Sequence, residues 1–187
     1  PDTRARAEEA IARELELDRR LARVAKRRID VVRMRIHGNY NLSQVLWTGA
    51  DFVIIDFESE PGRPLTQRRF KRSPLNDVAG LIRSLHRVSA AALVSGRHRA
   101  DDIVLLEGWA RDWSAWTSAA FLAGYLDRAR AGEHTGGVPR FVPATDADIE
   151  LLLEFFLLEK CIAEIADDLA NRPDWVDIPL RGLLALL

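Results

Sequence analysis

Apolar and polar positions follow a helical period at the start of the chain. Within the first 30 residues, a stripe recurs at near-helical spacing between Glu and Arg side chains: Ile11, Leu15, Leu21 and Val24. This pattern predicts one solvated leading helix over residues 5–28. A basic arm for nucleic acid is the alternative, but acidic residues interleave with the basic ones and favour the surface helix.

A short strand region is predicted over residues 31–60. Residues 31–36 are rich in β-formers and lead into a loop that begins at His37. Two apolar runs follow, residues 45–47 and 52–55, and a glycine-containing turn separates them. Two short apolar runs joined in this way predict a β-hairpin.

Residues 73–187 are predicted to be helical. Serine followed by proline at 73–74 is typical of a helix start, and we expect that helix to end near Leu93. A long helix from about Ile103 to Ala131 carries aromatic residues at spacings of three to five: Trp109, Trp113, Trp116 and Phe121. Tryptophans at helical spacing usually pack in a core, so we expect these to be interior. Stacking on sugar rings is the alternative.

Two more helices are expected near the end of the chain. Thr145 with Asp148 resembles a capping box and opens a helix that ends near Asn171, before Pro173. Pro179 is expected to start a last short helix. The elements therefore predict a mostly α (α+β) chain, with a small β-hairpin region before a helical bulk. Strands and helices do not alternate, which argues against a doubly wound parallel sheet.

Composition narrows the class of protein. The 187 residues suit a single domain, and 27 basic against 28 acidic side chains give a net charge of -1, so we expect no nucleic-acid partner. The single cysteine, Cys161, favours a cytoplasmic location and is expected to be a buried packing residue. The most apolar run, residues 151–170, contains charged side chains, so no membrane-spanning segment is expected.

The loop after residue 36 has the spacing of a phosphotransferase site. Such a site needs a carboxylate that orients the attacking hydroxyl and, five residues later, an amide that binds a metal. Beyond a hairpin, it needs an aspartate that holds the metal against phosphates. His37, Asn39, Gln44 and Asp56 occupy the places of this pattern in order. Asn39 carries no charge and cannot act as a base. A simple turn is the alternative reading of His-Gly-Asn.

The wider sequence resembles the C-terminal lobe of maltokinases, which are aminoglycoside-phosphotransferase-like kinases sometimes fused to trehalose synthase. Three segments carry the likeness: HGNYNLSQVLWTGADFVIIDFESEPGRPL, RRFKRSPLNDVAGLIRSL and FLLEKCIAEIADDLANRPDWVDIPLRGLL. Together they cover nearly the whole chain from about Ile36 onward. The resemblance implies a protein-kinase-like C-terminal lobe and ATP-dependent phosphorylation of maltose to maltose 1-phosphate, for glycogen or α-glucan synthesis.

The resemblance also assigns roles to single residues. The family loop reads HGDYHLGQ, so its catalytic aspartate falls on Asn39, while His37 matches. The metal-binding roles fall on Gln44 and Asp56, with Mg²⁺ and ATP as the implied cofactors. Asp77 matches an aspartate that supports the catalytic loop.

On the sugar side, the match is partial. Lys160 matches a lysine of the sugar pocket, Glu58 matches an acidic residue after the metal-binding aspartate, and Trp175 lies in a matching motif near the sugar. Ala163 and Asp167 stand where the family has two tyrosines. Maltose or a related sugar is the expected ligand.

These kinases also need an N-terminal lobe whose lysine and glutamate position the ATP phosphates. The residues before His37 are predicted to be mainly one helix, so we expect that lobe to be absent from this chain. Together with Asn39, this predicts a degenerate maltokinase-like chain with little or no activity. The alternative is a pseudokinase-type interaction or sugar-binding module. Its partner would be trehalose synthase, a glucan or a separate N-terminal lobe. An exposed apolar patch is expected where a lobe would dock, and a homo-oligomer could form there.

Overall fold

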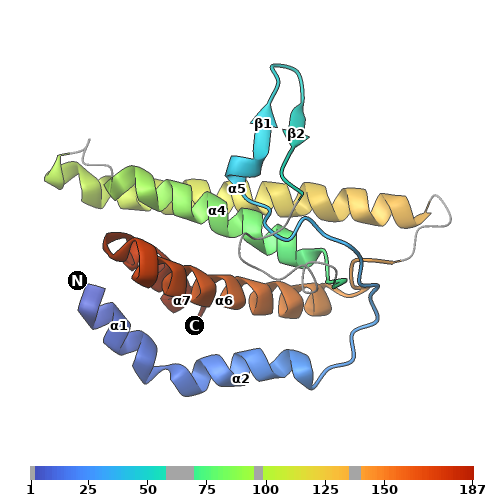
Figure 1. Ribbon diagram of the computed structural model, residues 1–187, viewed down its shortest axis with the longest axis horizontal. Coiled ribbons are helices and arrows are strands. Elements are labelled where there is room, and N and C mark those ends of the chain that lie inside the picture. The colour runs from blue at the N-terminus through green and yellow to red at the C-terminus, as the bar shows by residue number, and fades with distance from the viewer. Residues whose placement is uncertain (1–2, 58–69, 95–98, 135–139) are drawn as a thin grey trace.

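The computed structural model describes residues 3–57, 70–94, 99–134 and 140–187. Three long helices, α4 (Leu75–Val94), α5 (Ala100–His134) and α6 (Asp146–Asn171), form the body of the chain. A two-stranded hairpin projects from one side of this body, and the N-terminal helices lie along the opposite side (Figure 1). The prediction of a small strand region and a helical bulk is confirmed.

The leading segment is two helices, so the prediction of one continuous helix is wrong. α1 (Thr3–Ala12) ends one residue before Arg13, and α2 (Glu14–Ala25) begins one residue after it. α1 packs on α7 (Asp177–Leu186), whereas α2 packs on α6. The two halves pack on different helices through Ala10, Leu17 and Leu21, so the chain changes direction between them. Ile11 and Leu15 of the predicted apolar stripe are 70% and 71% exposed, so only part of that stripe is covered. At the bend, the side chain of Arg13 donates to the Leu184 carbonyl at 3.4 Å.

The predicted hairpin is present. β1 (Val45–Trp47) pairs antiparallel with β2 (Phe52–Ile54), and Trp47 lies opposite Phe52 with ring centroids 4.9 Å apart. The turn is closed by the Thr48 amide, which donates to the Asp51 carbonyl at 2.9 Å. Gly49 supplies the left-handed residue of the turn at φ 97°.

The strand predicted over residues 31–36 does not form as such. Its ladder is reduced to a single antiparallel bridge between Met34 and Arg72, with backbone hydrogen bonds of 3.0 and 2.9 Å. Val32 instead donates to the Arg140 carbonyl. Residues 31–36 therefore make only isolated backbone hydrogen bonds, because no strand among the described residues runs alongside them.

The main core lies where α4, α5 and α6 meet. Its buried members are Leu75, Val78, Ala129, Val142, Ile149 and Leu152. A second cluster joins α6 to α7 through Leu158, Cys161 and Leu183, and α2 packs against it. Cys161 is fully buried as predicted, and burial raises the pKa of its thiol to about 12.

The tryptophans of α5 are on the surface, so the prediction of a core role is wrong. Trp109, Trp113 and Trp116 are 70%, 45% and 78% exposed. The same helix turns Ser114 inward, at 7% exposure, and packs Phe121 and Tyr125 on the main core. The spacing of these aromatic residues correctly predicts a helix, but the buried face depends on which side of α5 meets α4.

The last helices begin close to the predicted positions. The Thr145 hydroxyl accepts from the Asp148 amide at 3.2 Å and caps α6 as expected. A 3₁₀ turn at Pro173–Trp175 follows, and α7 begins at Asp177, two residues before Pro179. In the described residues, every helix is too short or too polar to cross a bilayer.

Candidate functional site

The His37 loop is anchored to helix α4 by one carboxylate. Asp77 accepts hydrogen bonds from the backbone amides of His37 at 2.7 Å and Gly38 at 2.9 Å. Gly38 needs the left-handed conformation at φ 85° to present its amide in this way. Burial raises the pKa of the Asp77 carboxyl, and the two amide hydrogen bonds offset part of that shift. Asp77 therefore ties the first two residues of the loop to α4.

His37 holds the loop to the hairpin. Its ring is buried, and its Nε2 lies 2.8 Å from the Ile55 carbonyl, which can only accept. Nε2 therefore carries the proton, and Nδ1 accepts from the Asn39 amide at 3.3 Å. The ring also packs on Phe57, with centroids 4.9 Å apart. His37 thus orients the backbone at Asn39 and has no free nitrogen for substrate.

Asn39 stands at the wall of a cavity of about 670 Å³. Asn41 donates to the Asn39 backbone carbonyl at 3.0 Å and lies 3.4 Å from its side-chain oxygen. The Asn41 side chain also accepts from the Ser43 amide at 2.9 Å and caps the 3₁₀ turn η1 (Leu42–Gln44). These contacts give the loop a defined shape without any carboxylate at its centre.

Helix α6 forms the opposite wall of this cavity. Lys160, Ala163 and Asp167 recur at helical spacing and all line it, as do Glu164 and Arg172. The fold therefore brings together Asn39, Lys160 and the two positions where the resemblance expects tyrosines. Lys160 also acts on Asp77 electrostatically, since its charge lowers the pKa of that carboxyl against the larger effect of burial.

Two arginines that line the cavity, Arg87 and Arg172, pair with the buried Asp168, a network that the sequence-based predictions do not include. Arg87 of α4 makes a two-pronged hydrogen bond to Asp168 of α6, 2.7 Å at each oxygen. Asp168 is fully buried and also pairs with Arg172 at 3.2 Å. Trp175 does not line the cavity, but its ring lies under the Arg87 guanidinium at 5.9 Å. The spacing of Arg83 and Arg87 opposite Glu164 and Asp168 was the available signal.

The two predicted metal ligands lie on adjoining segments of the hairpin. The Ile55 amide donates to the Gln44 carbonyl at 3.0 Å, which places Asp56 one residue from this link. Asp56 is the only non-glycine with positive φ among the described residues, at 61°. Backbone strain of this kind concentrates at functional positions. Neither residue lines the 670 Å³ cavity. Glu58 lies outside the described residues.

Oxygen donors of this kind suit Mg²⁺, which prefers carboxylate and carbonyl ligands with phosphate oxygens and water. Gln44 offers one amide oxygen and Asp56 offers two carboxylate oxygens. These are donor types that Mg²⁺ accepts, and the binding of the ion by Gln44 and Asp56 remains a prediction.

Gly80 allows α4 to approach the loop. A Cβ atom added at Gly80 would lie 2.6 Å from the Tyr40 carbonyl oxygen, closer than any real contact. We expect Gly80→Ala to cost about 1–3 kcal/mol in unfolding free energy and to displace the loop. Gly124→Ala is the matched control, since nothing lies within 4 Å of that position, and should stabilise by about 0.5–1 kcal/mol. Urea unfolding of both variants tests this; equal effects would contradict it.

His86 of α4 should make stability depend on pH. Burial and the Arg83 charge lower its pKa to about 4, and Arg83 lies 3.2 Å from Nδ1. Between pH 4 and the unfolded value near 6.5, only the unfolded chain is protonated, so stability falls as pH falls through this window. We expect a loss of about 2–3 kcal/mol from pH 7 to 4.

His86→Gln keeps an acceptor for Arg83 but does not titrate. The pH dependence of the unfolding free energy, measured in urea, should therefore be shallower in this variant. Superimposable profiles for the two proteins would contradict the assignment.

The loop, the hairpin and the helical body together make up one fold. An aspartate-anchored loop, a hairpin and a strained aspartate, all carried on a helical body, form a kinase-like fold of the C-terminal-lobe type. No family model matches the chain.

Solved structures of glucosamine kinases share this fold. One, in crystal form B, has a TM-score of 0.75 at 20% identity, over 100% of this chain and 40% of that one. A glucosamine kinase in complex with glucosamine, ADP and inorganic phosphate has a TM-score of 0.67 at 19% identity, over 99% and 48%. Glucosamine kinase in crystal form A has a TM-score of 0.65 at 19% sequence identity, over 100% of this chain and 45% of that chain. The chain thus spans less than half the length of these neighbours, which establish its sugar-kinase-like fold.

Proposed function

We propose that this chain is the acceptor-sugar lobe of a maltokinase-like protein, with maltose or a related neutral sugar bound in the 670 Å³ cavity. The observation that carries the proposal is the meeting of Asn39 with Lys160, Ala163 and Asp167 around one space. The volume falls within the range of about 300–1,000 Å³ typical of small-molecule sites. The mixed polar and apolar lining suits a polyhydroxylated ligand.

The charges favour a neutral sugar over an amino sugar. Glu164 is already paired with Arg83 at 2.7 Å, and Asp167 with Arg172 at 3.0 Å. Arg87 is committed to Asp168. Lys160 adds a positive charge that would repel an ammonium group. Glucosamine, which the neighbour binds, is therefore expected to bind less tightly than maltose.

Phosphoryl transfer by this chain alone is expected to be weak or absent. Asn39 can hydrogen-bond a sugar hydroxyl but cannot accept its proton, because a side-chain amide has no basic site. Gln44 and Asp56 would hold Mg²⁺, which in such enzymes neutralises charge on the transferred phosphate. An N-terminal lobe or partner would have to supply the remaining contacts to ATP.

Calorimetry with maltose, glucosamine and Mg-ATP tests the proposal. We expect saturable maltose binding, weaker glucosamine binding and no maltose 1-phosphate. Lys160→Ala should weaken maltose binding about tenfold, corresponding to about 1.4 kcal/mol. Lys26→Ala, at an exposed site outside the lining of the cavity, is the matched control. Absence of sugar binding would overturn the acceptor-lobe proposal, and rapid product formation would overturn the role given to Asn39.

A second candidate function is that of an interaction module, and the hairpin favours it. Trp47 and Phe52 are 60% and 64% exposed, and Leu46 and Val53 are 48% and 45% exposed. Exposed apolar patches of this kind mark docking sites. Trehalose synthase, a separate N-terminal lobe or a second copy of the chain is the proposed partner.

Sedimentation of the chain alone and mixed with each candidate partner would test this second function. Trp47→Ser with Phe52→Thr should abolish any complex and leave maltose binding unchanged. A complex that survives these substitutions would place the interface elsewhere, and a monomer that binds none of the candidates would remove the interaction hypothesis.

A further inference from the structure

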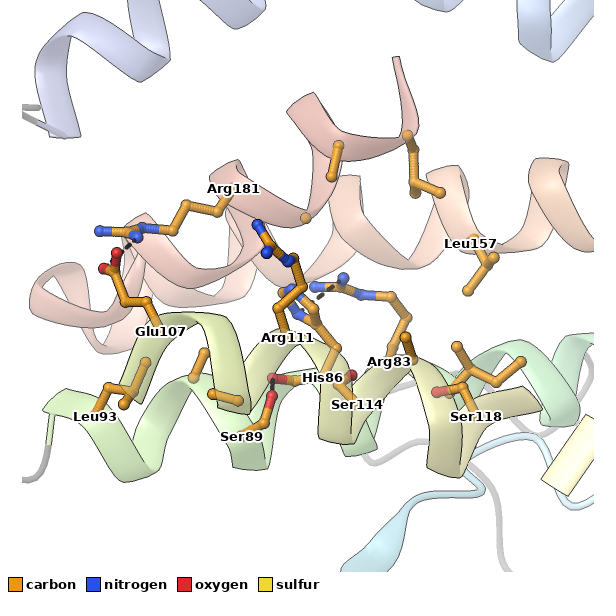
Figure 2. Close-up of a pocket in the computed structure, with 17 residues that line it drawn as sticks. Arg83, His86, Ser89, Leu93, Glu107, Arg111, Ser114, Ser118, Leu157 and Arg181 are labelled. Carbon is orange, nitrogen blue, oxygen red and sulfur yellow. Dashed lines mark hydrogen bonds and ion pairs between the residues drawn. The ribbon is translucent and has the colours of Figure 1, made fainter. Parts of the chain in front are cut away.

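A second cavity lies on a different face of α4 from the candidate sugar site. It has a volume of about 500 Å³, is open to solvent on one side, and is lined by α4, α5, α7 and one residue of α6 (Figure 2). Small side chains create the space, among them Ser89, Ala110, Ser114 and Gly182. The volume is that of a typical small-molecule site, and its lining is predominantly apolar.

Three guanidinium groups and one carboxylate line this cavity, and carboxylates outside the lining pair with two of the guanidinium groups: Glu164 with Arg83 and Asp177 with Arg181. Arg83, Arg111 and Arg181 line it against a single carboxylate, Glu107. Arg181 is committed to Glu107 at 3.0 Å, and Arg83 is committed to Glu164 at 2.7 Å. Figure 2 shows the Arg181–Glu107 pair at one end and the Arg83–His86 pair near the middle, with Arg111 between them.

Arg111 is the lining arginine that takes part in neither of these two ion pairs. Its ion pair within the described residues is with Asp112, the next residue, at a long 3.8 Å and with both side chains largely exposed. A pair of that kind contributes little, so exchanging it for a ligand carboxylate costs little. One weakly paired guanidinium matches one negative charge, whereas a phosphate dianion would leave a charge unpaired.

His86 adds a hydrogen-bond donor to the same cavity. Its Nδ1 faces the Arg83 guanidinium, which only donates, so the proton of the neutral ring is on Nε2. The ring stays neutral at pH 7 because burial and Arg83 disfavour its charged form. A neutral donor together with a guanidinium whose ion pair is long and exposed suits a carboxylate better than it suits a cation.

We propose that this cavity binds a small monocarboxylate with an aliphatic body, held by Arg111 at the carboxylate and by the small-residue lining at the chain. Glu164, which lines the candidate sugar site, connects that site to this cavity. Arg83 of this cavity and Arg87 of the sugar site both approach Glu164, at 2.7 and 3.9 Å. The proposal does not depend on the function assigned to the sugar site.

Hexanoate is the probe, and hexylammonium and hexan-1-ol are its cationic and neutral counterparts. We expect saturable hexanoate binding by calorimetry, with hexylammonium at least about tenfold weaker and hexanol intermediate. Arg111→Gln should reduce hexanoate affinity at least about fivefold. Arg128→Gln, an exposed arginine of the same helix outside the cavity, should leave that affinity unchanged.

A cavity-filling variant gives an independent test. Ala110→Leu places side-chain volume in the cavity and should abolish hexanoate binding, whereas Ala120→Leu on the exposed face of α5 should not. If Ala110→Leu fails to fold, the comparison of Arg111→Gln with its control Arg128→Gln still tests the proposal. Equal affinities for hexanoate and hexylammonium, unchanged binding in Arg111→Gln, or no binding at about 10 mM, far weaker than specific sites, would each overturn the proposal.

Discussion

Asp168→Ala should lower the free energy of unfolding by about 3–5 kcal/mol, the largest effect we expect from a single substitution. Asp168 is fully buried and accepts both prongs of the Arg87 guanidinium at 2.7 Å. It also pairs with Arg172 at 3.2 Å. Removing the carboxylate leaves a partly buried guanidinium without its partner, and that desolvated charge is the source of the cost. Urea unfolding followed by circular dichroism measures it.

Two variants separate the lost partner from the lost side chain. Asp174→Ala changes an exposed aspartate six residues away and should stay within about 0.5 kcal/mol of the parent protein. Replacing the pair together, as Arg87→Met with Asp168→Leu, should recover much of the stability, because no buried charge is then left alone. A double variant as unstable as Asp168→Ala would show that the carboxylate acts through other contacts.

Asp77→Ala should cost about 2–4 kcal/mol, because it leaves the partly buried amides of His37 and Gly38 without an acceptor, at about 1–2 kcal/mol each. Both amides donate to this carboxylate, at 2.7 and 2.9 Å. The loop should also loosen locally, so amide hydrogen exchange at His37 and Gly38 should accelerate beyond what the global loss of stability explains. Sugar binding should also weaken, because Asn39, which lines the cavity, is the residue directly after Gly38.

Asp77→Asn keeps one acceptor oxygen and should show an intermediate loss of about 1–2 kcal/mol. Asp127→Ala, at an exposed position of α5, is the control and should be nearly neutral. If the alanine and asparagine variants were equally stable, the hydrogen bonds to the loop amides would not be the cause.

The resemblance, not the spacing, assigned Lys160, Ala163 and Asp167 to a sugar pocket, and that assignment remains a prediction. Lys160, Ala163 and Asp167 share a helix, so their common face follows from the helical period, and all three line the cavity. The loop, the hairpin and its turn likewise depend on residues that are close together in the sequence. Trp175 was placed on the sugar side from its motif, yet it reaches the cavity only through Arg87. The roles of Asn39, Gln44 and Asp56 remain predictions.

The sequence by itself determined the helical bulk, the hairpin, the cap at Thr145 and the burial of Cys161, because propensity, turn chemistry and apolar content act over a few residues. Tertiary structure alone decided the break at Arg13, the outward face of the α5 tryptophans and the pairing of Arg87 with Asp168. Each of these depends on which helix lies alongside which. A periodic pattern fixes a stripe of side chains, but only the packing partner decides whether that stripe is buried, exposed or paired.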